Sequence, residues 1–483
     1  MSNNLVKKNT IYNVIKSACS ILFPLITFPY ISRTLMAEGV GKVNFGNSIV
    51  SYFALIASLG VTTYALKECS RNRDSKEKLS KVASEIFSIN VLSTMIAYMG
   101  LIITLVCAEN LQSYRVLIII QSSTILFTTF GTDWINSAME DFKYITLRTV
   151  FFQILSVVLM FIFINDPDDY IKYAIISVVA SSGANILNVI YRRKYCKIRF
   201  TIKMNIRKHL PPIILFFSMI LAQQIYVNSD TTILGIFKGD FEVGLYSTSV
   251  KIYTIVNTMI ASVSTVVWPQ IAEAYKNNRQ DDVNRLAKYS LGFILTFGLP
   301  AIVGINVIAK EIILIISGEE YISASTSLHI LTIALFFSFL GGWASSTNFL
   351  PNGKEKICLF ASGCAAVINI TLNLILIPKW GLNAAAFTTG LSEFVSICVL
   401  IVKYDRKQKI EGLSEMLKGP LIGCGFIVLA SYCIRLITSN YILISICTIS
   451  VSVVGYVIIL LLVKNSFFMG YVKPIVNKLK RRT

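Results

Sequence analysis

Charged residues are scarce in this chain of 483 residues. Only 15% are Asp, Glu, Lys or Arg, and 26 acidic residues stand against 45 basic ones. A soluble domain carries roughly 25% charged residues. The chain therefore lacks the polar surface of a soluble protein of its length, which would normally form about three domains.

The sequence also lacks the residue patterns of common catalytic and metal sites. His209 and His329 have no ligand-type neighbours in sequence, and none of the ten cysteines forms a CxxC pair. There is no HExxH, no glycine-rich phosphate loop and no nucleophile motif. There is no room for a soluble nucleotide-binding domain beside the apolar runs. We therefore expect neither an enzyme nor an ATP-driven pump, and we expect no cofactor and no metal.

Long apolar runs are what the sequence has in abundance. Hydrophobic residues make up 54% of the chain, in runs of about 18–25, the length that a helix needs to cross ~30 Å of hydrocarbon. We predict an all-α integral membrane protein of about fourteen transmembrane helices. The predicted spans are 11–32, 43–66, 83–107, 114–136, 148–165, 170–190, 211–236, 243–268, 287–309, 326–349, 356–377, 381–402, 418–438 and 441–463.

The basic residues alternate between the two sides of these spans. Of the 45 Lys and Arg residues, 35 fall in the segments on the side of the N-terminus, 7 on the other side and 3 within spans. Basic residues concentrate in cytoplasmic loops of membrane proteins. We expect a multi-pass membrane protein with both termini in the cytoplasm. The net charge of +19 then needs no nucleic-acid partner.

A few ionisable side chains fall within or at the ends of the spans, where each costs a few kcal/mol and marks a functional candidate. The basic candidates are Lys16, Arg33 and Lys251, and the acidic ones are Asp133, Asp230 and Glu393. A structural ion pair of Lys251 with Asp230 is the alternative. Arg435 lies near the end of its span, from where its side chain can reach the interface.

Two further features of the sequence suggest a kink or hinge in the first span and two related halves. Pro24 and Pro29 interrupt the first span, and each removes a backbone hydrogen bond, so we expect a kink or hinge there. The sequence Glu38-Gly39-Val40-Gly41 is echoed by Phe241-Glu242-Val243-Gly244 six spans later. An even offset gives both halves the same topology, as in parallel repeats.

Several stretches resemble the oligosaccharide flippases of the polysaccharide transport family, which move O-antigen and capsule repeat units. At the junction near Glu140 the family often has Phe-Gln-Gly where this chain has Asn136-Ser137-Ala138. The resemblance extends from residue 1 to about 402 and is carried by Phe28–Leu35 with Glu38–Gly41, Asp133-Trp134 with Glu140–Arg148, Asn228–Gly235, Val243–Tyr246 with Lys251, Leu350–Lys354 and Gly381–Glu393.

The resemblance implies two six-helix lobes, related by a pseudo-two-fold along the membrane normal, that face a central cavity and work by alternating access. The lobes would span residues 1–200 and 201–410, with two additional helices and a basic tail in 411–483. The cargo would be an undecaprenyl pyrophosphate-linked oligosaccharide, bound through Lys16, Arg33 and Lys251. A coupling cation, proton or sodium, would use Asp133, Asp230 or Glu393.

Membrane lipid, a polysaccharide polymerase and a chain-length regulator would be further partners. Two alternatives stay open. A multidrug or lipid II exporter of the same superfamily would share this architecture. A polytopic polysaccharide polymerase or glycosyltransferase would normally carry a long external loop with catalytic residues, and the predicted external loops are short.

Overall fold

The computed structural model describes residues 3–404 and 412–470. In those residues it contains helices and their connections and no strand. The chain divides into two compact units, residues 1–244 and 245–483. The predicted lobe boundaries at residues 200 and 410, and the two-fold relation, stay predictions.

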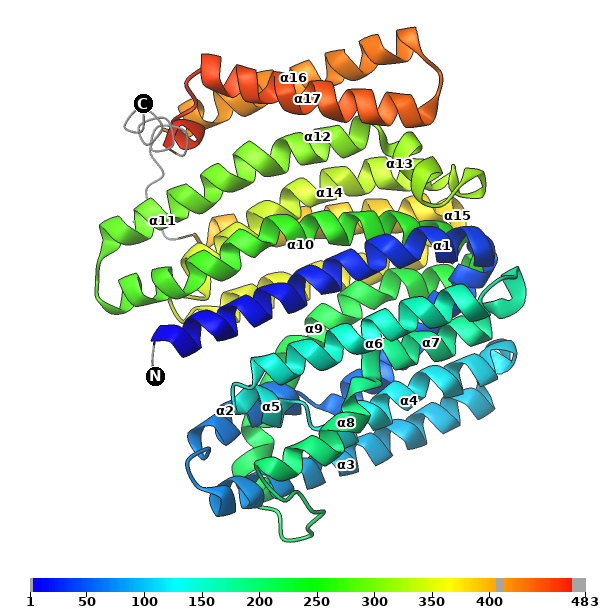
Figure 1. Ribbon diagram of the computed structural model, residues 1–483, viewed down its shortest axis with the longest axis vertical. Coiled ribbons are helices and arrows are strands. Elements are labelled where there is room, and N and C mark those ends of the chain that lie inside the picture. Colours follow the sequence, from blue (N-terminus) through cyan, green and yellow to red (C-terminus); the bar gives the residue numbers. More distant parts are fainter. Residues whose placement is uncertain (1–2, 405–411, 471–483) are drawn as a thin grey trace. The chain divides into compact units, whose positions relative to one another are not determined.

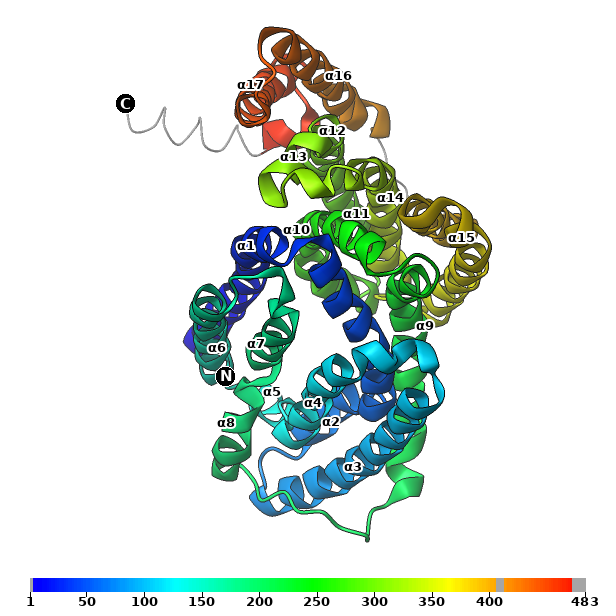
Figure 2. The same ribbon diagram turned by 90° about the vertical axis from the view of Figure 1, so that its right-hand side faces the viewer.

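Unit 1 packs its helices around α1. This helix contacts α3, α4, α6 and α9, and Figure 2 shows α3 beside α4 and α6 beside α7. The helices of unit 1 are α1 (Asn3–Ser58), α2 (Val61–Arg71), α3 (Lys76–Cys107), η1 (Glu109–Tyr114), α4 (Arg115–Gly131), α5 (Trp134–Ala138), α6 (Phe142–Phe163), η2 (Pro167–Asp169), α7 (Tyr170–Ser182), α8 (Ala184–Tyr191), η3 (Arg192–Lys194) and α9 (Ile206–Lys238).

Unit 2 is built on close pairs of helices, of which α14 with α15 and α16 with α17 are the most extensive (Figure 1). Its first helix begins five residues before the unit does. The helices are α10 (Asp240–Lys276), α11 (Gln280–Phe293), the π-helical η4 (Ile294–Gly298), α12 (Leu299–Val307), α13 (Ala309–Ile316), η5 (Glu319–Tyr321), α14 (Ala324–Ala344), the π-helical η6 (Ser345–Phe349), α15 (Glu355–Val402), α16 (Leu413–Ile437) and α17 (Tyr441–Leu462).

The described residues contain eleven helices long and apolar enough to cross a membrane. The first of them covers two of the predicted spans, and α15 covers two more. The predicted span 211–236 falls on α9. The all-helical membrane architecture is confirmed, while the exact number of crossings stays a prediction.

Helix α3 shows why these helices suit lipid. Its large apolar side chains point outward: Met95 is 62% exposed and Val106 is 67% exposed. The opposite face, with Ala97 and Leu101, is buried inside unit 1. Such a continuous apolar surface would be unfavourable in water, but it is the natural exterior of a helix in hydrocarbon.

The break between the first two predicted spans lies at Met36, not at the prolines. Helix α1 continues through Pro24 and Pro29, and Met36 has φ 58° and ψ 178°. This break falls between the predicted spans 11–32 and 43–66, and no proline stands at it. A hinge role for Pro24 and Pro29 stays a prediction.

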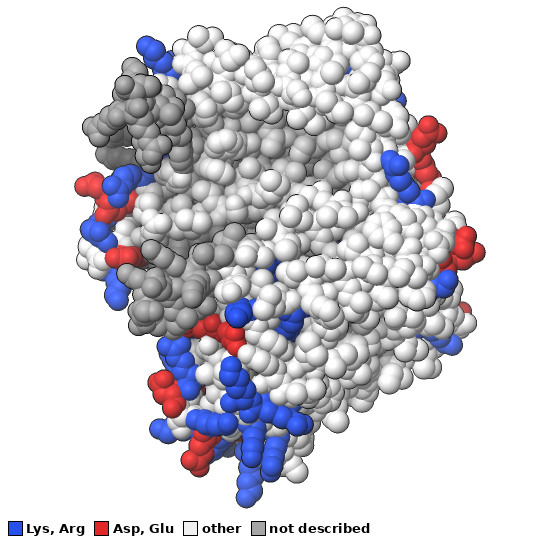
Figure 3. All heavy atoms as spheres, in the orientation of Figure 1, with Lys and Arg blue, Asp and Glu red and all other residues white. Residues whose placement is uncertain are grey.

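Basic side chains gather at the end of unit 1 where α2 ends and α3 begins (Figure 3). The extended segment Lys197–Thr201 lies along α3 there. The hydroxyls of Ser80, Ser84 and Ser88 accept hydrogen bonds from the backbone N–H groups of residues 197, 199 and 201, at 3.1, 3.1 and 2.8 Å. We call these three residues the serine ladder. It fixes the start of the connection between α8 and α9 without a partner strand.

Arg435 forms an ion pair rather than only reaching toward the interface. Its guanidinium lies 2.9 Å from both carboxylate oxygens of Glu311, and it donates to the Val307 carbonyl at 2.6 Å. The Glu311 side chain is only 4% exposed. Together these contacts tie α16 to the junction of α12 and α13.

Candidate functional site

The two echoed motifs meet in space. A Cβ on Gly41 would overlap the Asp240 carbonyl oxygen, and a Cβ on Gly244 would overlap the Ala37 carbonyl oxygen. The backbones of α1 and the start of α10 therefore touch through reciprocal glycines. Only glycine permits so close an approach. The echo noted in the sequence marks this helix crossing.

Around this crossing, polar side chains pair with one another. Lys42 lies 2.8 Å from Glu38 and 5.2 Å from the centre of the Tyr170 ring. The Tyr114 hydroxyl donates to Asp240 at 2.7 Å. These contacts hold the start of α10 against the rest of unit 1.

The basic candidates are distributed over both units. Lys16 is half-buried and Arg33 is exposed, both on α1 in unit 1. Arg33 lies one turn before the break at Met36. Lys251 is half-buried on α10 in unit 2. A shared site for Arg33 and Lys251 stays a prediction, as does the alternative pairing of Lys251 with Asp230.

Asp230 lies in a polar cluster inside unit 1. It is 5% exposed on α9, and the neighbouring Ser229 is 4% exposed. Two residues further on, and so on another face of α9, Thr232 donates to Ser48 at 2.9 Å and lies 3.1 Å from the Tyr52 hydroxyl. The Asp230 charge is close enough to act on Tyr52. A carboxylate buried in this way is a candidate to take up a small cation or a proton.

Asp133 has a different environment, because it forms an ion pair with Arg148, whose side chain is 5% exposed. Arg148 also donates to the Ala184 carbonyl at 3.3 Å and lies over the Tyr144 ring. Asn188 lies 3.5 Å from the same Asp133 oxygen. These contacts join α5, α6 and α8, which favours a structural role for Asp133.

The neighbouring turn is held by Asp141, which caps α6 by accepting the Tyr144 N–H at 3.2 Å. Tyr191 and Tyr195 donate to its other oxygen at 2.6 and 2.5 Å. Burial alone would raise the pKa of Asp141, but these hydrogen bonds and the Lys194 charge lower it overall. The resemblance at residues 140–148 thus coincides with a packed helix junction.

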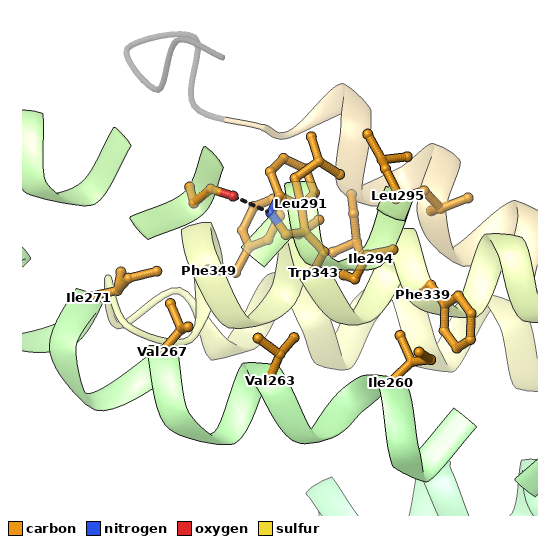
Figure 4. Packing of buried hydrophobic residues seen from close by; sticks show 14 of the residues in the cluster. Ile260, Val263, Val267, Ile271, Leu291, Ile294, Leu295, Phe339, Trp343 and Phe349 are labelled. Atoms are coloured by element: carbon orange, nitrogen blue, oxygen red, sulfur yellow. Dashed lines mark hydrogen bonds between the residues drawn. The ribbon is translucent and has the colours of Figure 1, made fainter. Parts of the chain in front are cut away.

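Glu393 lines a cavity of ≈ 300 Å³ in unit 2, whose mostly apolar surface includes several polar groups. The cavity lies between α10, α14 and the second arm of α15. Its remaining lining residues are Asn257, Ile260, Ala261, Ser264, Ile294, Ser338, Phe339, Gly341, Gly342, Trp343, Ser345, Ser396 and Leu400. We call it the Glu393 cavity. Figure 4 shows Ile260 of α10 directed toward Phe339 of α14 beside it.

A second cavity in unit 2, of ≈ 410 Å³, is almost entirely apolar. It lies between α12, α16 and α17 and includes Pro300, Gly304, Ile427, Val453 and Leu460 in its lining. The Tyr456 hydroxyl at its wall is used internally, because it donates to the Thr296 carbonyl at 2.7 Å. Such a lining suits a hydrocarbon chain and little else.

Sequence reasoning missed two of these arrangements. His209, which has no ligand-type neighbour in sequence, is fully buried between the Tyr64 hydroxyl at 2.7 Å and Glu85 at 2.8 Å. The polar wall of the Glu393 cavity did leave a signal. Ser338, Gly341, Gly342 and Ser345 follow the spacing i, i+3, i+4, i+7 of one helix face.

Comparison with known proteins gives two family matches. Residues 6–275 match the family described as "Polysaccharide biosynthesis protein", and residues 214–375 match the MatE family. The first match covers more than half of the chain.

Similar proteins agree with these matches. A putative O-antigen transporter of Escherichia coli K12 is 22% identical, over 76% of this chain and 89% of its own length. The capsular polysaccharide biosynthesis protein CapF of Staphylococcus aureus is 21% identical, over 82% and 97%. The lipid II flippase MurJ in an inward closed conformation shares the fold, with a TM-score of 0.74 at 18% identity over 93% of this chain and 98% of that one.

Proposed function

Because the chain belongs to the polysaccharide biosynthesis protein family, we propose that it is a flippase for lipid-linked oligosaccharide repeat units in the synthesis of O-antigen, capsule or exopolysaccharide. The observation that carries the proposal is the family match over residues 6–275 in a chain of long apolar helices. The named relatives are transporters and polysaccharide biosynthesis proteins. We place the protein in the bacterial cytoplasmic membrane with both termini inside.

The chemistry of the cargo explains why a protein is needed. An undecaprenyl pyrophosphate-linked oligosaccharide carries negative phosphates and a polar glycan, and moving these groups unaided through hydrocarbon is prohibitive. A water-filled cavity with basic side chains lowers that cost. We assign the phosphate contacts to Lys16, Arg33 and Lys251, the basic candidates of the two units.

The lipid chain of the cargo does not need a polar path. We propose that it lies against the apolar cavity between α12, α16 and α17 while the headgroup crosses. The almost entirely apolar surface of that cavity supports this assignment. It also gives the two C-terminal helices a part in transport.

We propose that a cation gradient drives the movement, with Asp230 as the coupling carboxylate. Its deep burial supports it over Asp133, whose side chain is 43% exposed. Glu393 is the remaining candidate for the coupling cation. Proton and sodium are both compatible with a buried carboxylate.

Deleting the gene in its own host tests the proposal. We expect undecaprenyl-linked oligosaccharide to accumulate in the membrane while surface polysaccharide disappears, because synthesis continues and translocation stops. Lipid extraction followed by mass spectrometry measures the accumulated intermediate. Loss of the oligosaccharide itself from the lipid fraction would instead assign the protein to its synthesis.

The match of residues 214–375 to the MatE family favours one second candidate, a multidrug exporter. In that case deletion would leave surface polysaccharide intact and increase sensitivity to cationic dyes. Measuring both phenotypes in the same strain separates the two functions.

A further inference from the structure

The Glu393 cavity combines the side chains that recognise sugars. Six of its fourteen lining residues carry polar side chains: one carboxylate, one amide and four hydroxyls. Trp343 and Phe339 add aromatic rings to the wall. Amides, hydroxyls and carboxylates exchange hydrogen bonds with ring hydroxyls, and apolar aromatic surface covers the C–H faces of a ring.

The volume suits a small organic ring better than a bare ion. At ≈ 300 Å³ the cavity reaches the lower end of the range of small-molecule sites, about 300–1,000 Å³. A coordinated cation needs its oxygen ligands within about 2.6 Å on several sides. The lining contains a single carboxylate. Its other polar side chains are uncharged hydroxyls and one amide.

The cavity has open space next to two glycines of α14, where larger side chains could have stood. A Cβ built on Gly341 or on Gly342 meets no atom within 4 Å. These glycines are therefore not required for helix packing, unlike Gly41 and Gly244. Ser345, at the edge of the same wall, begins a π-helical turn, a local irregularity that frequently occurs at functional sites.

The residues of α10 that line the Glu393 cavity lie on one face of this helix. Asn257, Ile260, Ala261 and Ser264 follow the spacing i, i+3, i+4, i+7. Lys251 precedes Asn257 by six residues, roughly one and two-thirds turns, so it belongs to a different face of α10. The cavity is thus distinct from the basic positions assigned to the phosphates.

The predicted topology places the cavity in the cytoplasmic half of the membrane. The spans 243–268, 326–349 and 381–402 all end on the cytoplasmic side in that topology, and the lining residues lie in the later half of each. A lipid-linked oligosaccharide is loaded from the cytoplasmic leaflet, which fits a sugar site at this depth.

We propose that the Glu393 cavity binds one monosaccharide ring of the translocated glycan, with Glu393 and Asn257 exchanging hydrogen bonds with its hydroxyls. This inference rests on the proposed flippase function. It assigns Glu393 to cargo recognition and leaves Asp230 as the coupling carboxylate. It also makes the cavity a determinant of which repeat units are accepted.

The test uses the purified full-length protein in detergent and saturation-transfer NMR, which detects weak binding. The probes are the methyl glycosides of glucose, galactose, mannose, rhamnose and N-acetylglucosamine. Gly342→Leu places a side chain in the cavity from a position where a Cβ meets no atom within 4 Å, and Glu393→Gln keeps the shape but removes the charge. Gly425→Leu is the matched control, because Gly425 also has open space around it and lies exposed on α16.

We expect saturation transfer to at least one glycoside in the wild type and in Gly425→Leu. It should fall about tenfold in Glu393→Gln, as expected for lost hydrogen bonds to a charged acceptor, and vanish in Gly342→Leu. Equal transfer in all four proteins, or none in the wild type, would overturn the proposal. So would normal glycoside binding in Glu393→Gln combined with loss of the response of export to sodium or an uncoupler, since that result identifies a cation site. The gene deletion tests the flippase function separately. Glycoside binding is measured on the purified protein and does not depend on the result of the deletion.

Discussion

At the scale of single residues, a charge in a span can serve the cargo, the coupling ion or the fold, and its partners decide between these roles. The sequence places Asp133 and Asp230 in equivalent settings, each a carboxylate within an apolar run. The structure separates them, since Asp133 is 43% exposed and pairs with Arg148, whereas Asp230 is buried inside unit 1. The pairing could not be predicted because Arg148 lies fifteen residues away, across a turn whose geometry depends on tertiary contacts.

The Asp133–Arg148 pair gives a stability prediction. Asp133→Asn leaves the buried Arg148 guanidinium without its carboxylate, so we expect clearly less folded protein in the membrane. Arg148→Gln in the same chain should restore part of it. Quantitative immunoblotting of membranes measures the amount, and Arg285→Gln, which breaks the more exposed pair with Asp282, is the control. Normal insertion of Asp133→Asn with an altered response to an uncoupler would return Asp133 to the coupling candidates.

The phosphate contacts give a second prediction at this scale. Arg33→Ala and Lys251→Ala should each strongly reduce export, and Arg33→Lys should be worse than Lys251→Arg, because only the planar guanidinium donates two parallel hydrogen bonds to one phosphate. The measurement is surface polysaccharide per molecule of inserted protein. Near-normal export in both alanine variants would remove the two residues from the site. Rescue of Lys251→Ala insertion by Asp230→Ala would indicate a structural pair instead.

At the scale of elements, composition predicts the helices well and their irregularities poorly. Apolar runs of membrane-spanning length identified the long helices because hydrocarbon thickness fixes their length. The break in α1 at Met36 was not announced by any proline at that position, and a kink at Pro24 and Pro29 stays a prediction. A helix can continue through a proline where neighbouring helices satisfy the freed carbonyl group, and sequence alone does not show those neighbours. The polar wall of the Glu393 cavity was readable only as a spacing of small residues.

The crossing of α1 and α10 gives a prediction at this scale. Gly41→Ala and Gly244→Ala each force a methyl group onto a backbone carbonyl of the other helix, so we expect about 1–3 kcal/mol of destabilisation or more. Lower apparent unfolding temperatures of the detergent-purified variants measure this. Gly363→Ala, at a glycine with open space around it, should unfold like the wild type. Unchanged unfolding of Gly41→Ala and Gly244→Ala would show that the helices can separate at little cost.

At the scale of the whole molecule, the bias of basic residues toward one side is the main argument for the orientation in the membrane. A test of that orientation needs residues that a labelling reagent can reach. Cys69 and Cys196 lie in predicted cytoplasmic segments, but both are fully buried. Burial also raises the pKa of the Cys196 thiol to about 11, so thiol reagents would react slowly with it on either side. Native cysteines at these positions therefore cannot report the topology.

Introduced cysteines can. In a chain whose ten native cysteines are replaced, Asp168→Cys should react with an impermeant maleimide in intact cells, and Asp74→Cys only after lysis. Both positions are exposed, and they fall on opposite sides of the predicted topology. Mass-tag shifts on a gel measure the labelling. Strong labelling of Asp74→Cys before lysis would invert the orientation and move the Glu393 cavity to the outer half of the membrane.

The serine ladder has a consequence for amide hydrogen exchange. The hydroxyls of Ser80, Ser84 and Ser88 also donate to carbonyls of α3, at 2.6, 2.7 and 2.8 Å, so each is anchored while it accepts from the extended segment. The amides of residues 197, 199 and 201 are bonded, whereas those of 198, 200 and 202 have no acceptor among the described residues. We expect deuterium uptake to alternate along this segment with a period of two, resolved by fragmentation that localises the label to single amides. Replacing the three serines by alanine should make uptake uniformly fast. The alternating protection typical of an edge strand would then occur in a loop whose partner is a helix. Its loss during transport would show that the connection between α8 and α9 detaches from α3.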